Sequence, residues 1–165
     1  MAGFIGWGPS FAIFVGAWLV FWLCYHGIRW LLDRRRRAIG REIGLDVEAV
    51  EQPVRRGQEL EALLDIATPE GLGSVEVGVV CTEYYQEDNS DADNPGRRIT
   101  CKAIAHEAWQ PVEVVAGAQS ARFTIPAGAP FSYEGSCLSF GWELVGRGQR
   151  HGLDAEARTK LSVLP

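Results

Sequence analysis

The hydrophobic and polar positions of this 165-residue chain follow two different patterns. The first is an unbroken apolar stretch from Phe11 to Leu32, FAIFVGAWLVFWLCYHGIRWLL, with no acidic residue and one permanent cation, Arg29. As a helix, these 22 residues extend roughly 33 Å at ~1.5 Å per residue, enough to cross a hydrocarbon core of about 30 Å. The pattern therefore predicts a transmembrane helix at 11–32, after a short N-terminal segment at 1–10.

Positive charge follows the apolar stretch in the segment 33–44, DRRRRAIGREIG. A cleavable signal peptide has the reverse order, with positive charge before a shorter apolar core. Arginines beside a membrane helix stay on the cytoplasmic side, so the N-terminus is predicted outside and the rest of the chain in the cytoplasm. The segment is predicted to be a basic juxtamembrane linker that could extend the helix by two turns before Gly40 and Gly44 weaken it. Its arginines, which stop translocation or contact anionic lipid headgroups, are Arg34, Arg35, Arg36, Arg37 and Arg41.

The second pattern is alternation of apolar and polar residues, which is typical of half-buried strands. It occurs near 47–50 and in 58–66, 74–85, 97–109, 120–125, 137–144 and 157–163. The clearest case places Leu138, Phe140, Trp142 and Leu144 on one face. In 97–109, Ile104 and Trp109 are out of phase, which predicts a bulge or burial on both faces. The fold class is therefore one transmembrane α-helix plus an all-β domain at 45–165, an antiparallel β-sandwich of about seven strands.

Formal charge divides the chain in the same place. Residues 1–41 hold six Arg and one Asp, for a charge of +5, whereas residues 42–165 hold ten Lys or Arg and twenty Asp or Glu, for a charge of −10. Nucleic-acid binding needs clustered cations to displace counterions from phosphates. The acidic part of the chain therefore argues against a nucleic-acid partner.

The apolar stretch carries a distinct helical face of Trp18, Trp22, Tyr25 and Arg29. This face could dock a neighbouring membrane helix, or it could be lipid-facing aromatics with an arginine that reaches the interface. His26 could ligate a haem or chlorin metal if a partner supplied the pocket, although an interfacial histidine is the ordinary case.

The region from Arg122 to Pro165 contains FTIP, then AP, then SYEG, a strand ending in WELVGRG, and a final DAEARTKLSVLP. This order resembles arrestin-like β-sandwich domains, including bacterial relatives of the sporulation-control type, within the broader immunoglobulin-like class. The positions that match the signature turn and core of that family are Pro130, Ser132, Tyr133, Gly135 and Trp142. The resemblance implies protein–protein interaction as an adaptor or scaffold, without catalysis. Two departures are the length, which suffices for one sandwich where the family usually has two, and the membrane helix.

Candidate chemistry is sparse. His106 and His151 lie far apart and outside any catalytic motif, and Cys24, Cys81, Cys101 and Cys137 show no CxxC spacing, so no zinc site and no cofactor are predicted. In the cytoplasm, the three cysteines of the predicted strands should be reduced and buried. Outside it, Cys81 and Cys101 are the candidate disulfide.

The stretch QEDNSDADNPG does not satisfy the pattern of an EF-hand, because Pro95 and Lys102 occupy ligand positions. Two alternatives are left for this stretch: looser calcium binding by Asp88, Asp91 and Asp93, or a solvated hairpin tip.

Two main hypotheses follow. The first is a non-catalytic, membrane-anchored interaction module, such as an adaptor, scaffold or accessory subunit of a larger membrane complex. The second is an extracytoplasmic envelope domain of the same fold that engages a ligand or Ca²⁺. A hydrolytic enzyme, a third class, needs His106 or His151 beside a carboxylate in a cleft.

Overall fold

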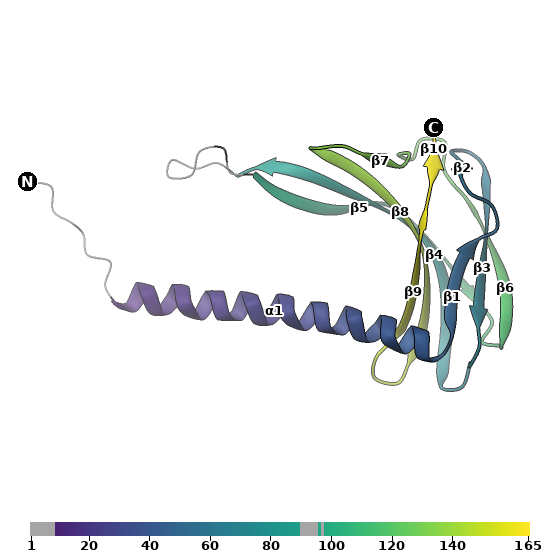
Figure 1. The fold of residues 1–165 in the computed structure, drawn as a ribbon, viewed down its shortest axis with the longest axis horizontal. Helices are drawn as coiled ribbons and strands as arrows, with labels where there is room; N and C mark the ends of the chain where they lie inside the picture. Colours follow the sequence, from purple (N-terminus) through teal and green to yellow (C-terminus); the bar gives the residue numbers. More distant parts are fainter. Residues whose placement is uncertain (1–8, 90–95, 97) are drawn as a thin grey trace, which may run out of the picture. The chain divides into compact units, whose positions relative to one another are not determined.

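The computed structural model describes residues 9–89, 96 and 98–165 (Figure 1). Within them lie one helix and ten strands. Their bounds are α1 Pro9–Glu42, β1 Leu45–Ala49, β2 Val54–Arg55, β3 Glu59–Ile66, β4 Leu72–Asp88, β5 Arg98–Val112, β6 Gly117–Thr124, β7 Tyr133–Glu134, β8 Leu138–Arg150, β9 Ala155–Leu161 and β10 Val163–Leu164.

The helix α1 is continuous over 34 residues. Within the described residues, the helical stretch Val15–Glu42 is long and apolar enough to cross a membrane, with a mean hydropathy of 1.3 over its most apolar 18 residues. The basic segment 33–44 is helical as far as Glu42, as a two-turn extension of the apolar helix anticipates. The chain divides into two compact units between Arg36 and Arg37, so the last turns of α1 belong to the same unit as the strands.

The C-terminal end of α1 is built into the second unit by two glycines. A β-carbon at Gly40 would lie 2.5 Å from the backbone oxygen of Glu156, so only glycine allows the helix to approach β9 this closely. Gly40 therefore does not end the helix. Gly44 does, because its φ of 64° is a left-handed conformation that favours glycine and turns the chain into β1.

The strands form a sandwich, as the alternation predicts. A three-stranded sheet has the order β1-β3-β6, and a five-stranded sheet has the order β5-β4-β8-β7, with β9 also paired to β8 (Figure 1). Antiparallel pairing joins the strands of both sheets, while the short β2 and β10 pair in parallel. The buried side chains between the sheets include Val47, Leu60, Leu64, Ile66 and Phe123 from the first sheet and Val75, Val77, Val79, Trp142 and Leu144 from the second.

The predicted irregularity in 97–109 is a bulge. Cys81 on β4 pairs with His106 of β5, but its neighbour Thr82 pairs with Ile104, so one residue of β5 is extra. The bulge changes the phase of β5, and for this reason Ile104 and Trp109 do not fit one alternating series.

The five-stranded sheet extends beyond the core at one end. On β4, burial ends at Thr82, and Tyr84 and Tyr85 are exposed. The prediction that Leu138 fills the core is wrong, because β8 begins in this extension and Leu138 is 37% exposed. Phe140 is half-buried at its edge, whereas Trp142 and Leu144 lie in the core as predicted.

Candidate protein-interaction surface

The predicted signature turn is held in place by hydrogen bonds to neighbouring strands. The indole Nε1 of Trp142 donates to the carbonyl of Pro130 over 3.0 Å. The backbone N–H of Val163 donates to Oγ of Ser132 over 2.8 Å, and the N–H of Ser132 donates to the carbonyl of Val163 over 2.8 Å. These bonds join the turn before β7 to the last strand, so Pro130, Ser132 and Trp142 have a structural role.

Tyr133 and Gly135 of the same turn lie closer to solvent. Tyr133 is 48% exposed, and a β-carbon at Gly135 would lie 2.7 Å from the Tyr133 hydroxyl. Tyr133 therefore does not fill the core, and its ring contributes to the surface.

The aromatic face of α1 is exposed along its described length. Trp18, Trp22 and Tyr25 are all exposed, and the Arg29 guanidinium donates to the Tyr25 hydroxyl over 3.4 Å. The imidazole of His26 has its centroid 4.3 Å from the ring of Trp22. This contact places His26 on the margin of the predicted face.

The arginines that follow this face contact a neighbouring aromatic ring and the helix backbone. The guanidinium of Arg34 lies 5.3 Å from the centroid of the Trp30 ring. Nε of Arg41 donates to the carbonyl of Arg37, one turn earlier on the helix. Arg35 is exposed, while Arg36 is half-buried.

The outer face of the five-stranded sheet is a second surface, which the alternation did not single out. Trp109 of β5, Gly78 of β4 and Val145 of β8 lie side by side on it, followed by Arg158 of β9. The Trp109 ring occupies the space above Gly78, and the Arg147 guanidinium lies 4.5 Å from that ring's centroid. Val145 is buried although it lies outside the core between the sheets. The sequence signal for this surface was the out-of-phase Trp109.

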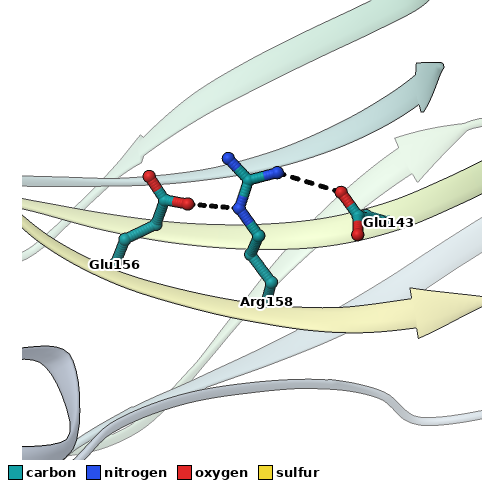
Figure 2. A network of polar contacts seen from close by, with 3 residues as sticks. All are labelled: Glu143, Glu156 and Arg158. Carbon is teal, nitrogen blue, oxygen red and sulfur yellow. Dashed lines mark hydrogen bonds and ion pairs between the residues drawn. The ribbon is translucent and has the colours of Figure 1, made fainter. Parts of the chain in front are cut away.

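Ion pairs order the neighbouring part of this face. Arg158 lies between Glu143 and Glu156, with Nη1 donating to Glu143 over 3.0 Å and Nε donating to Glu156 (Figure 2). Burial acts to lower the pKa of Arg158, but the hydrogen bonds and charges of Glu156 and Glu143 raise it overall. Glu156, which is 8% exposed, therefore has a compensating charge beside it.

A cleft of about 470 Å³ lies next to these ion pairs. Its lining includes Thr82, Gly141, Glu143 and Lys160, together with the aromatic residues Tyr84, Tyr133 and Phe140. Its size is within the range of small-ligand and side-chain pockets, roughly 300–1,000 Å³.

The cysteines do not form the candidate disulfide. Cys81 lies opposite His106 and Cys101 opposite Tyr85, so the two are four residues apart along β4 and β5, or about 13 Å at ~3.3 Å per residue. A disulfide requires Cα atoms within about 7 Å. Cys81 is buried as predicted. The prediction that Cys137 is a buried strand residue is wrong, because Cys137 is exposed and precedes β8.

The remaining candidates are dispersed. His106 lies in β5 near Trp142, whereas His151 is exposed and follows the end of β8 at Arg150, roughly 26 Å beyond Trp142 at ~3.3 Å per residue. Asp88 ends β4, while Asp91 and Asp93 lie outside the described residues. Among residues that the structure describes, no group of three or more His, Cys, Asp or Glu could hold a metal ion.

Neither a known protein family nor a curated protein matches the sequence. The fold is similar to the crystal structure of Spo0M, a sporulation control protein from Bacillus subtilis, with a TM-score of 0.51 and 12% identity. The similarity covers 73% of this chain and 49% of Spo0M, so this chain spans about half the length of that protein. At this identity the likeness concerns the fold alone. It supports the resemblance to arrestin-like sandwiches as a coarse relation of fold.

Proposed function

We propose that this chain is a membrane-anchored protein-interaction module without catalytic activity, acting as an adaptor, scaffold or accessory subunit of a larger membrane complex. The observation that carries the proposal is the continuity of α1. The helix extends unbroken from the apolar stretch to Glu42, and its last turns belong to the unit that contains the sandwich. An anchor of this kind raises the concentration of the domain's surface near membrane partners.

The arginines beside the anchor give the proposal its orientation. Arg34, Arg35, Arg36, Arg37 and Arg41 follow the apolar stretch, so the N-terminus is outside and the sandwich is cytoplasmic. The same side chains can bind anionic headgroups, with Trp30 and Arg34 in contact at the boundary.

Two surfaces are available for partners. The first is the aromatic face of α1, made of Trp18, Trp22, Tyr25 and Arg29. The second is the outer face of the five-stranded sheet, where exposed aromatic and charged side chains surround a cleft. Membrane helices associate through packing and polar contacts, and sandwich domains bind through exposed faces and edges. The fold shared with Spo0M supports an interaction or regulatory role.

The experiment is extraction of the full chain in a neutral detergent, followed by mass spectrometry of the proteins that remain bound. Substituting Trp18, Trp22 and Tyr25 by Leu should preserve insertion and release partners that bind the helix. The matched control changes Val20, Leu23 and Leu31 on the opposite helical face to Leu, Val and Val. Recovery of no specific partner with the unaltered chain would contradict the proposal. If the aromatic variant retains all partners, the helix face is not a partner-binding surface.

A further inference from the structure

The cleft beside the ion pairs lies at the point along β8 where its neighbouring strand changes from β9 to β7. β9 pairs with β8 as far as Trp142, and β7 pairs with it from Phe140, so Gly141 lies between the two partners. On the other side, Gly141 is opposite Thr82 of β4, which is 5% exposed. A residue without a side chain and a small buried one together form the floor of the cleft.

The space above Gly141 is not filled by the chain itself. A β-carbon at Gly141 would have Tyr84 Cε2 as its nearest neighbour, at 3.8 Å, which is ordinary contact. At Gly78, two rows further along β4, the corresponding space is occupied by Trp109. The contrast identifies the cleft as a vacant side-chain position on this face.

An aromatic ring and carboxylates line this position. Tyr84, which is 40% exposed, lies on the Gly141 face with Glu134, because both are opposite Ser139 of β8. Tyr133 and Phe140 border the cleft, but they pair on the other face of the sheet. Glu134 and Glu143 supply carboxylates, and Lys160 supplies one opposing ammonium. Arg158 binds Glu143, so Glu134 is the lining carboxylate outside that ion pair.

The domain pairs its own cations with aromatic rings at several places. Arg147 lies 4.5 Å from the Trp109 ring centroid, Lys102 lies 5.7 Å from that of Tyr84, and Arg56 lies 5.5 Å from that of Phe131. A ring and a carboxylate together attract guanidinium or ammonium groups. The charge of −10 over residues 42–165 steers basic partners toward the domain.

We propose that the cleft above Gly141 binds an arginine or lysine side chain from a basic segment of a partner protein. This inference rests on the proposed function, because cytoplasmic juxtamembrane segments of membrane proteins are rich in Arg and Lys. A domain held at that side of the membrane meets such segments. The partner is therefore a membrane protein whose juxtamembrane segment inserts one cation beside Glu134 and the ring of Tyr84, which share the Gly141 face of the sheet.

The experiment measures fluorescence anisotropy of a labelled arginine-rich peptide with the purified full chain in a neutral detergent. Gly141→Val fills the cleft and should weaken binding at least about tenfold. Glu134→Gln should also weaken it, whereas Lys160→Gln should strengthen it by removing the opposing charge. Gly128→Val, on a turn where a β-carbon meets nothing within 4 Å, is the matched control and should bind as the unaltered chain does. Thermal unfolding of each variant shows whether it remains folded.

Three outcomes would overturn the inference. The first is equal binding by folded Gly141→Val. The second is equal binding of a peptide with Glu in place of Arg, or weaker binding by Lys160→Gln, either of which indicates a carboxylate ligand. The third is a dimer of the chain that dissociates when Arg34–Arg37 are changed to Gln, which makes a second copy the occupant. Because the assay uses no membrane partner, its failure leaves the co-purification result intact, and failure of co-purification leaves the peptide affinity measurable.

Discussion

The indole ring of Trp109 occupies the space that a side chain at Gly78 would need. A β-carbon at Gly78 would lie 2.4 Å from Cε3 of Trp109, closer than any side chain tolerates. On the same ring, the Arg147 guanidinium lies 4.5 Å from the centroid. The glycine, the ring and the cation thus come from three adjacent strands, β4, β5 and β8, and cover the outer face of the sheet.

The Gly78→Ala substitution should destabilise the domain by about 1–3 kcal/mol, because the rigid Trp109 ring must move and lose its contacts with Arg147. Urea unfolding followed by tryptophan fluorescence measures the change. Gly141→Ala, where the nearest neighbour is at 3.8 Å, serves as the control and should change the free energy of unfolding little. Equal stability of Gly78→Ala and the unaltered chain would show that the ring does not lie over this glycine.

The sandwich was predictable because alternation reports burial directly. Val75, Val77 and Val79 alternate with polar or small residues, and all three are in the core. Even the bulge in β5 was detectable, because Ile104 and Trp109 break the phase. Burial of one face of a strand can be predicted from the sequence, because every second residue must then be apolar.

Three features needed the structure. Leu138 follows the same alternation as Trp142, but the facing sheet is too short to cover it, and sheet length is a property of the paired strands. The cleft above Gly141 depends on where β7 and β9 end along β8. Glu143, Arg158 and Glu156 meet only because the register of β8 and β9 brings them together (Figure 2). Local alternation of apolar and polar residues does not predict which residues of distant strands lie opposite each other.

The junction between α1 and the sandwich provides a second stability test. Gly40→Val should cost about 1–3 kcal/mol, since its side chain would collide with the backbone oxygen of Glu156 and the helix end would shift away from β9. Ile39, which packs against the core, should then become more exposed to hydrogen exchange at its own amide and its neighbours. Gly27→Val, where a β-carbon has nothing within 4 Å, is the control. Unchanged exchange in Gly40→Val would contradict the close contact.

The corner at Trp142 should be sensitive to loss of a single hydrogen bond. Trp142→Phe removes the donor to the carbonyl of Pro130 and leaves a small void, for an expected loss of about 2–4 kcal/mol. Ser132→Ala removes the acceptor of the Val163 N–H and should cost about 1–2 kcal/mol. Chemical unfolding measures both. A loss below about 0.5 kcal/mol in Trp142→Phe would show that the corner does not stabilise the fold.

Stability should fall at alkaline pH in a way that depends on Cys81. Burial, with a smaller contribution from Glu83, raises the pKa of this thiol from 9.0 to about 11. The folded chain then holds the proton more tightly than the unfolded chain, so this contribution is fully present below about pH 9 and is lost between 9 and 11. Urea titrations across this range should give a steeper decline for the unaltered chain than for Cys81→Ala. Parallel declines would contradict a buried thiol at this position.

The most direct test of membrane anchoring with a cytoplasmic sandwich is labelling of Cys137 by a membrane-impermeant maleimide. The variant to use changes Cys24, Cys81 and Cys101 to Ala and keeps Cys137, which is exposed. The chain should remain in the membrane pellet after alkaline carbonate extraction, and Cys137 should react only after the cells are permeabilised. Labelling in intact cells would place the sandwich outside and favour the envelope-domain hypothesis. Release of the chain into the soluble fraction would contradict the anchor itself.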